Sequence, residues 1–271
     1  MLFPLYDLLT HRRIPWLTVL IILANVVVMG WLTQEGSQKA VDVAYRYGFI
    51  PLRVSEIGKA KAIVVSVPEV NARGEVDPNV APRKLQLSVA SSAVYMTFLT
   101  TMFLHGGWIH LASNMWMLWI FGNNIEDRLG HLMYLFYYFL GGLIATLAHY
   151  AVDPTSEMPV VGASGAVAAV LGGYAISYPK AKVRTLVFFG MVMIVDMPAL
   201  VLLGFWFVLE TIMGLIQLGG DVVSPVANWA HVGGFIAGIV LLPLFTLGTS
   251  PPETDWRKEA EEMFKFDNPR P

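Results

Sequence analysis

Three apolar stretches of the sequence contain polar residues whose chemistry is complementary. Ser164 lies in GASGAVAAVLGG, His231 lies in NWAHVGGFIAG, and His110 and Asn114 lie in HGGWIHLASNMW. A serine hydroxyl is a weak nucleophile until a base removes its proton, which a neutral imidazole can do. The tetrahedral intermediate of acyl transfer then needs hydrogen-bond donors, each worth on the order of 10²–10³ in rate. His110, Asn114 and the backbone N–H of Ser164 are candidate donors.

The spacing of these residues indicates which of them share a helix face. His110 and Asn114 are four residues apart and point from one face, whereas His105, five residues before His110, is expected to point elsewhere. The three therefore do not form a ready-made metal site, and the sequence has no HExxH motif. An alternative role for His110 and Asn114 is interhelical hydrogen bonding.

Small residues line one face of each helix expected to carry Ser164 and His231. The two stripes consist of Ser164, Ala168 and Gly172, and of His231, Gly234 and Gly238. Small residues allow the backbones of membrane helices to approach closely. We therefore expect the stripes to pack together and to bring the hydroxyl of Ser164 to the imidazole of His231.

A complete triad would add a carboxylate on the far side of His231. Beyond the second apolar stretch, the acids within apolar sequence are Asp196 and Glu210, and the sequence places neither at the depth of His231. We therefore predict a Ser-His dyad, with Asp196 and Glu210 lining a polar interior or pairing locally. GASGA also lacks the second glycine of the GxSxG elbow of soluble hydrolases.

Composition indicates a membrane environment for these groups. Of the 271 residues, 55% are hydrophobic and only 14% are charged, against about 25% charged in globular proteins. The mean hydropathy is +0.58. The net charge of -2 gives no electrostatic reason to expect nucleic acid as a partner. Because the chain has no Cys, disulfides and thiol chemistry are excluded.

Six stretches are apolar enough to cross a bilayer core of about 30 Å, which takes about 20 residues. They run approximately over 15–33, 108–125, 132–152, 162–178, 198–218 and 229–247. The apolar stretch 185–196 is too short to span and is interpreted as a loop or interfacial segment. The sequence thus predicts an all-α membrane protein with six transmembrane helices over 15–248 and a long external first loop, 34–107. The first stretch is interpreted as an anchor rather than a cleaved secretory signal.

Lys and Arg beside the spans give the orientation, because they favour the cytoplasmic side. Arg12 and Arg13, Arg128, and the basic residues at 180–184 place the amino-terminal segment 1–14 and the tail 249–271 in the cytoplasm. The four candidate chemical residues then share the external half of the membrane. Within the first loop, 62–70 and 84–90 alternate like two strands of a hairpin. The stretch 94–104 is apolar enough to lie at the membrane interface.

In this combination the chain resembles the rhomboid intramembrane serine proteases. FLHGGWIHLASN matches their pattern of His, four residues, His, three residues, Asn, and GASG matches their GxSG. AHVGGFIAG matches AHxxGxxxG, and EDRLG at 126–130 resembles ExRxG. The resemblance covers residues 103–238 in the expected order.

This resemblance implies a six-helix core that cleaves transmembrane protein substrates in the lipid bilayer. Ser164 would be the nucleophile and His231 the general base, while His110, Asn114 and the Ser164 amide would form the oxyanion hole. Glu126 and Arg128 would tie down the second helix. No cofactor is implied. The resemblance also suggests a multi-pass protein of a bacterial inner membrane.

The sequence departs from some members in two places. Some stack an aromatic residue, one turn after the nucleophile, against the catalytic histidine, but Ala168 occupies that position here. The imidazole must therefore be oriented otherwise, with Trp229 or packing alone as the alternatives. Some members also carry a Trp-Arg pair in the first external loop, whereas residues 34–107 contain no Trp.

Two other functions compete with proteolysis. A catalytically inactive rhomboid-like protein would bind membrane clients without cutting them, although such relatives typically lack the serine, the histidine or both. A transporter would use His110, His231, Asp196 and Glu210 as a proton relay near the midplane. No inverted repeat is visible in the sequence to support a transporter.

Overall fold

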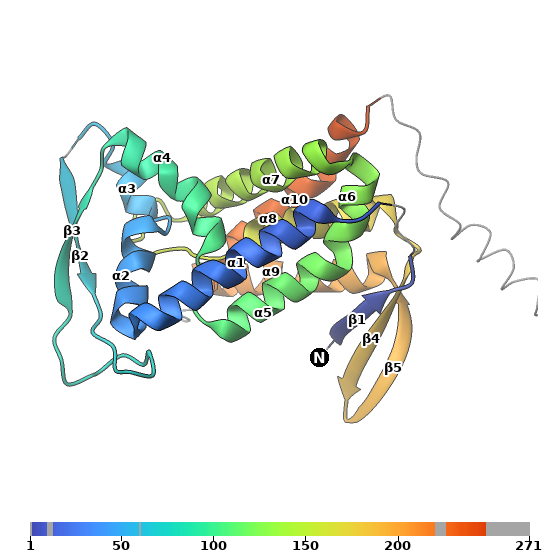
Figure 1. Cartoon of the computed structure of the whole chain (residues 1–271), viewed down its shortest axis with the longest axis horizontal. Helices are drawn as coiled ribbons and strands as arrows, with labels where there is room; N and C mark the ends of the chain where they lie inside the picture. The colour runs from blue at the N-terminus through green and yellow to red at the C-terminus, as the bar shows by residue number, and fades with distance from the viewer. Residues whose placement is uncertain (1, 10–12, 60, 220–225, 248–271) are drawn as a thin grey trace, which may run out of the picture.

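The computed structural model describes residues 2–9, 13–59, 61–219 and 226–247. The predicted tail, 249–271, and Arg12 of the orientation argument lie outside this part of the chain. Within it, helices run side by side along the longest axis, and a small β-sheet stands at each end (Figure 1). We call these ends the β2–β3 end and the β4–β5 end.

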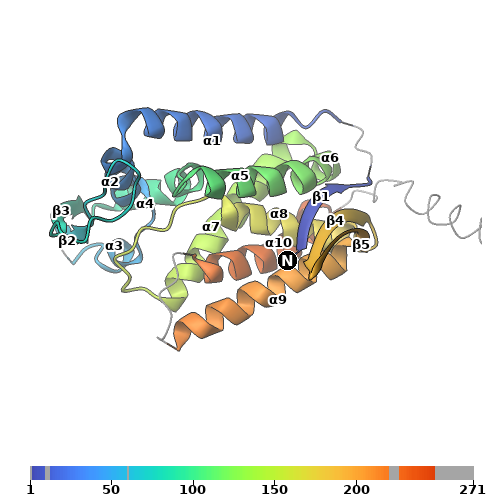
Figure 2. The ribbon, with the colours of Figure 1, turned by 90° about the horizontal axis from the view of Figure 1, so that it is seen from below.

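Four of the described helices are long and apolar enough to cross a membrane. They are α1 (Trp16–Glu35), α7 (His131–Val152), α9 (Ala199–Leu218) and α10 (Asn228–Phe245). A fifth apolar helix, α8 (Ser164–Ser177), is shorter and is buried along most of its length. All five begin and end within two residues of a predicted span. Figure 2 shows α1 and α9 on opposite sides of the bundle, with α8 between them.

The predicted second span, 108–125, is helical but is not one regular α-helix. It consists of α5 (Trp108–Met117), a π-helical stretch η2 (Leu118–Gly122) and α6 (Asn123–Leu129). Hydrogen bonds in a π-helix run from i to i+5, which rotates the downstream residues relative to a regular helix. Face assignments counted from His110 therefore hold only as far as Met117. The ring of Phe121 in η2 is fully buried edge-on against Tyr174 of α8.

Residues 34–107 contain the hairpin that the alternating pattern predicts. The strands β2 (Ala62–Val67) and β3 (Arg83–Ser88) pair antiparallel, and their inward side chains form a small core with neighbouring residues such as Ile50. Arg83 contacts both Asp42 and Glu69. The other elements of this region are α2 (Ser37–Tyr47), α3 (Pro51–Ser55), α4 (Ser91–Thr100) and η1 (Thr101–Phe103). The apolar stretch 94–104 is thus mainly helical.

At the opposite end, the stretch predicted as a loop or interfacial segment, 185–196, is instead part of a β-sheet. The strands β4 (Lys182–Phe189) and β5 (Met191–Pro198) form a hairpin, and β1 (Leu2–Asp7) pairs with the other side of β4. Gly190 makes the turn at a φ of 76°, which favours glycine. The prediction of an all-α protein is therefore wrong at the β4–β5 end, whereas the hairpin at the β2–β3 end was predicted, and most of the fold is helical.

The strand β1 is fixed to the helices by polar and aromatic contacts. The indole Nε1 of Trp116 on α5 donates to the carbonyl of Pro4 at 2.8 Å, and the Trp116 ring stacks on Phe3. Asp7 accepts hydrogen bonds from the hydroxyl of Tyr174 and the amide of Asn124, both at 2.7 Å. The amino-terminal segment is therefore built into the β4–β5 end.

Glu126 joins α6 to the beginning of α1. Its fully buried carboxylate accepts the backbone N–H groups of Leu17 at 2.9 Å and Thr18 at 2.8 Å, and the Thr18 hydroxyl at 2.7 Å. The first turn of a helix has N–H groups without helical acceptors and favours a negative charge. His131 Nδ1 lies 2.6 Å from the same carboxylate. Glu126 thus fixes the α6 end of the second helical run to α1.

The helices α8 and α10 pack with their backbones in contact, as the two small-residue stripes predict. A Cβ atom at Gly234 would overlap the carbonyl oxygen of Gly165, and one at Gly238 would overlap that of Ala169. Tyr137 on α7 donates to the carbonyls of Ala169 at 2.8 Å and Gly238 at 3.0 Å. Glycine is therefore required on α10 wherever it crosses α8 this closely.

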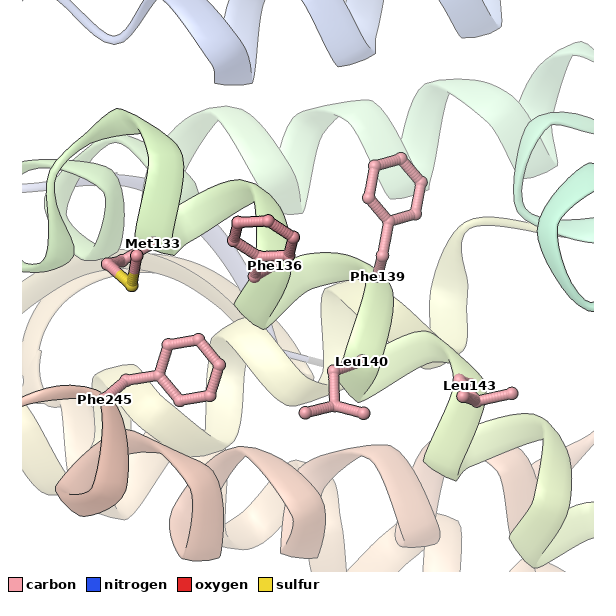
Figure 3. Close-up of a pocket in the computed structure, with 6 residues that line it drawn as sticks. All are labelled: Met133, Phe136, Phe139, Leu140, Leu143 and Phe245. Carbon is pink, nitrogen blue, oxygen red and sulfur yellow. The ribbon is translucent and has the colours of Figure 1, made fainter.

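An apolar groove of about 480 Å³ lies on the outside of the bundle between α7 and the end of α10 (Figure 3). Its lining residues are Met133, Phe136, Phe139, Leu140, Leu143 and Phe245. These side chains carry no titratable or nucleophilic group, so the groove offers no catalytic chemistry.

Replacing Gly234 by Leu should force α8 and α10 apart, because the new side chain would occupy the space of the Gly165 carbonyl. We expect a loss of about 3 kcal/mol in the free energy of unfolding, measured on purified protein in detergent. Gly204→Leu is the matched control, since a Cβ there would meet nothing within 4 Å. Equal stability of the two variants would contradict the packing argument.

Asp7 should make stability depend on pH. Burial raises the pKa of the Asp7 carboxyl from 3.8 to about 6. The native state therefore binds this proton more tightly than the unfolded state, and its contribution to stability is lost as pH rises from about 4 to about 6. Asp7→Asn keeps an oxygen that can accept both hydrogen bonds. Its melting temperature should exceed that of the wild type at pH 8, and the wild-type decline over this pH range should disappear. Identical pH profiles would contradict this assignment.

Candidate active site

The structure brings Ser164 and His231 into direct contact. The Oγ of Ser164, the first residue of α8, lies 2.8 Å from Nε2 of His231 in the first turn of α10. Both residues are partly buried. Their approach depends on the glycine contacts between α8 and α10. The predicted pairing of hydroxyl and imidazole is thus present in the geometry that a serine nucleophile and its base require.

The start of α8 offers a place for negative charge. Ser164 is the first helical residue, so its N–H belongs to the amides that have no acceptor inside the helix. The positive end of the helix dipole lies at the same point. Just before it, Gly162 has a φ of 134°, which favours glycine, and it donates its N–H to the carbonyl of Thr101 at 3.0 Å.

The ring of His110 lies close to both Gly162 and Ser164, and the region between them is called the space over Gly162. The position that a Cβ atom of Gly162 would occupy is 3.0 Å from His110 Nε2 and 3.5 Å from Ser164 Oγ. The N–H of Gly106 donates to His110 Nδ1 at 3.4 Å. In the neutral ring, Nδ1 then acts as acceptor and Nε2 carries the proton, by assignment from the hydrogen bonds. His110 therefore directs a donor into the space over Gly162, beside the hydroxyl of Ser164.

Asn114 is buried on α5 one turn after His110. Its Nδ2 donates to the carbonyl oxygen of His110 at 3.1 Å. This bond is thus within its own helix rather than toward Ser164. The amide nitrogen carries a second N–H group that this bond does not use.

His105 lies beside His110, contrary to the expectation that it points elsewhere. The two ring centroids are 5.1 Å apart, and the rings meet edge to face. The N–H of Ala163 lies 3.4 Å from His105 Nε2, which accepts it. Helical spacing failed here because α5 begins only at Trp108, so His105 belongs to the preceding connection. His105 therefore supports the segment that precedes Ser164.

Glu210 on α9 contacts the other nitrogen of His231, which corrects the prediction of a dyad without a nearby carboxylate. Its Oε2 lies 2.7 Å from His231 Nδ1. The same oxygen accepts Nδ2 of Asn228 at 2.6 Å, and Asn228 Oδ1 accepts Nε2 of Gln217. Sequence reasoning missed Glu210 because the separation along the chain did not reveal how α9 is rotated and placed beside α10.

Asp196 does not reach the site. It forms a bidentate ion pair with Arg184 across the β4–β5 hairpin, with nitrogen–oxygen distances of 2.8 and 3.0 Å. This confirms the predicted local pairing for Asp196. It also removes one of the four members of the proton relay that a transporter would use.

An aromatic ring from α9 lies near the imidazole of His231, where α8 supplies only Ala168. The Trp206 ring centroid is 5.9 Å from that of His231, and the planes are inclined by 34°. Trp229, the residue suggested by the sequence, instead lies against α9, where a Cβ at Gly214 would come within 3.2 Å of its ring. The residue beside the histidine is therefore Trp206.

Comparison with known proteins gives relatives of several origins. Rhomboid-like protein 11, chloroplastic, of Arabidopsis thaliana is 32% identical over 55% of this chain and 52% of that protein. Presenilin-associated rhomboid-like protein A, mitochondrial, of Danio rerio is 28% identical over 65% of this chain and 43% of its own length. Rhomboid protease GluP of Bacillus subtilis is 31% identical over 56% of this chain and 26% of its own length.

The chain thus spans about half or less of each of these three relatives. Two of them are named for chloroplasts or mitochondria and one is bacterial. The relatives therefore do not support the expectation of a bacterial inner membrane. The model described as the rhomboid domain matches residues 92–247, which is more than half of this chain and includes all four candidate site residues. The chain belongs to the rhomboid family.

Proposed function

We propose that this protein is an intramembrane serine endopeptidase that uses Ser164 as nucleophile and His231 as general base. The observation that carries the proposal is the 2.8 Å contact between Ser164 Oγ and His231 Nε2 within a bundle of apolar helices. Membership of a family that includes a named rhomboid protease supports it. The substrates would be membrane proteins cut in or near their transmembrane segments.

In the first half of the reaction, His231 Nε2 would take the proton of Ser164 as Oγ attacks the carbonyl carbon of the scissile peptide bond. The carbonyl oxygen becomes an oxyanion in a tetrahedral intermediate. Its collapse breaks the C–N bond, and protonated His231 gives the proton to the leaving amine. An acyl ester on Ser164 remains, and the product that carries the new amino terminus leaves.

In the second half, water would lose a proton to His231 and attack the ester carbon. The second tetrahedral intermediate collapses, Ser164 Oγ regains the proton from His231, and the carboxylic product leaves. Each oxyanion would be stabilised in the space over Gly162 by Nε2–H of His110, the N–H of Ser164 and the second amide N–H of Asn114. Donors fixed by helices before the reaction need little reorganisation when the charge forms.

We further propose six spans with both termini in the cytoplasm. The run α5–η2–α6 and the enclosed helix α8 would complete the bundle formed by the four long apolar helices. The region 34–107 would then form the external first loop, and the four site residues would lie in the external half of the membrane, where water can reach them.

The second candidate, a catalytically inactive protein that binds membrane clients, requires no contact between the hydroxyl and the imidazole. The close approach of Ser164 to His231, and the donor of His110 facing the same space, favour proteolysis. A transporter, which would use a proton relay, has less support because Asp196 is paired with Arg184 on the β4–β5 hairpin.

Ser164→Ala should abolish cleavage of a reporter transmembrane protein in liposomes, because the variant loses the Oγ that lies beside His231. Ser113→Ala is the control, since this hydroxyl is bonded to the carbonyl of His110 on α5. The melting temperatures of both variants should match the wild type. Cleavage that persists in Ser164→Ala would reject the nucleophile and, with it, the proposed function.

Asn114→Ala should lower kcat by about 10²-fold if the amide donates to the oxyanion. Because this hydrogen bond would form only in the transition state, KM for the reporter should change little. Steady-state cleavage in detergent separates the two constants. An unchanged kcat would return Asn114 to a structural role within α5.

A further inference from the structure

We infer that Glu210 is a positioning residue that converts the proposed pair into a Ser164–His231–Glu210 triad. This inference rests on the proposed function, and it adds a residue that acts on the substrate only through His231. It is carried by the chain of contacts from Ser164 Oγ to His231 Nε2, and from His231 Nδ1 to Glu210 Oε2, at 2.8 and 2.7 Å.

Glu210 determines the tautomer of His231. An ionised carboxylate can only accept hydrogen bonds, so the contact with Glu210 requires the proton of the neutral imidazole to be on Nδ1. The lone pair is then on Nε2, which faces the hydroxyl of Ser164. The opposite tautomer would place a lone pair toward the carboxylate and could not accept the serine proton. Glu210 thus selects the form of the ring that can act as a base.

The carboxylate of Glu210 is itself held by a chain of amides. Asn228 Nδ2 donates to the same oxygen of Glu210 at 2.6 Å, while Asn228 Oδ1 accepts Nε2 of Gln217. An inverted Asn228 amide would bring two acceptor oxygens together, so the direction of this chain is fixed. Gln217 also donates to the carbonyl of Val226 at 3.1 Å. These bonds join α9 to the beginning of α10 and set the carboxylate at the height of His231.

Glu210 also faces the positive charge that forms during the reaction. When His231 takes the serine proton, this charge lies within hydrogen-bond distance of the carboxylate. The side chains of His231 and Glu210 are only 13% and 18% exposed, so water screens this attraction less than at an open surface. A carboxylate in this position stabilises the imidazolium that forms during the proton transfer.

The orientation of the His231 ring also depends on Glu210. The small side chain of Ala168 provides no stacking surface from α8, and the ring of Trp206 is inclined by 34° at 5.9 Å rather than stacked face to face. A hydrogen bond to Nδ1 fixes rotation of the imidazole about its Cβ–Cγ bond, which loose aromatic contact does not. The carboxylate therefore supplies the orientation that an aromatic residue on α8 would otherwise provide.

Glu210→Gln tests this role because it keeps the shape and the acceptor oxygen but removes the charge. We expect kcat for the reporter to fall by about 10²- to 10⁴-fold with KM nearly unchanged. The rate at which a fluorophosphonate labels Ser164 should fall in parallel, and the melting temperature should stay close to that of the wild type. Thr211→Ala is the matched control, as its hydroxyl is bonded to the carbonyl of Phe207 in the same helix.

Glu210→Asp separates charge from shape and provides a second variant if Glu210→Gln does not fold. A triad requires the carboxylate, so Asp should retain more kcat than Gln. A purely structural bridge between α9 and α10 would favour Gln, whose length is unchanged. Wild-type kcat in Glu210→Gln, or a higher kcat in Gln than in Asp, would overturn the triad.

Ser164→Ala, measured in the same assay, distinguishes the two levels of inference. Loss of cleavage in Ser164→Ala together with full activity in Glu210→Gln would reject the triad and leave the protease intact. Cleavage in Ser164→Ala would reject the protease proposal itself. Loss of kcat in both variants, with wild-type activity in Thr211→Ala, would support both inferences.

Discussion

Backbone contact between α8 and α10 is the constraint on which the candidate site depends. At Gly234 and Gly238 the α10 backbone comes so close to the carbonyls of Gly165 and Ala169 that no side chain fits between them. This approach sets Ser164 and His231, each in the first turn of its helix, at hydrogen-bond distance. Tyr137 reinforces the crossing with bonds to both backbones. The contact between Ser164 and His231 at one end of the helices therefore depends on glycine residues further along α10.

Sequence alone predicted this part of the molecule because the relevant information is local. Spacings of three, four and seven residues identify which groups share a helix face, and an apolar run identifies its length. The pairing of Ser164 with His231 and the strands at 62–67 and 83–88 follow from such patterns. The patterns do not contain the rotation of one helix about its axis relative to another.

The residues that sequence reasoning misplaced depend on geometry that spacing along a helix does not contain. Glu210 reaches His231 because α9 lies beside α10 in one particular rotation, which also selects Trp206 rather than Trp229 as the nearby aromatic ring. His105 lies beside His110 because it precedes Trp108, the first residue of α5, so helical spacing does not apply to it. The strands β4 and β5 were predicted as a loop or interfacial segment because the apolar stretch 185–196 is too short to span a bilayer and does not alternate between apolar and polar residues. Polar residues within apolar stretches can therefore be identified as functional candidates from the sequence, but their partners can be identified only from the structure.

The pairing of β1 with β4 also has a consequence for biogenesis. Tyr6 and Arg184 are 178 positions apart, yet they are bonded across neighbouring strands. The strand β1 must therefore wait until most helices have been synthesised before its partner emerges from the ribosome. Until the two strands meet, the β4–β5 hairpin has an additional unpaired edge, of the kind that invites pairing with other chains. The pairing of β1 with β4 would then be among the last steps of folding. If it failed, β4 would keep an unpaired edge that could pair with strands of other proteins.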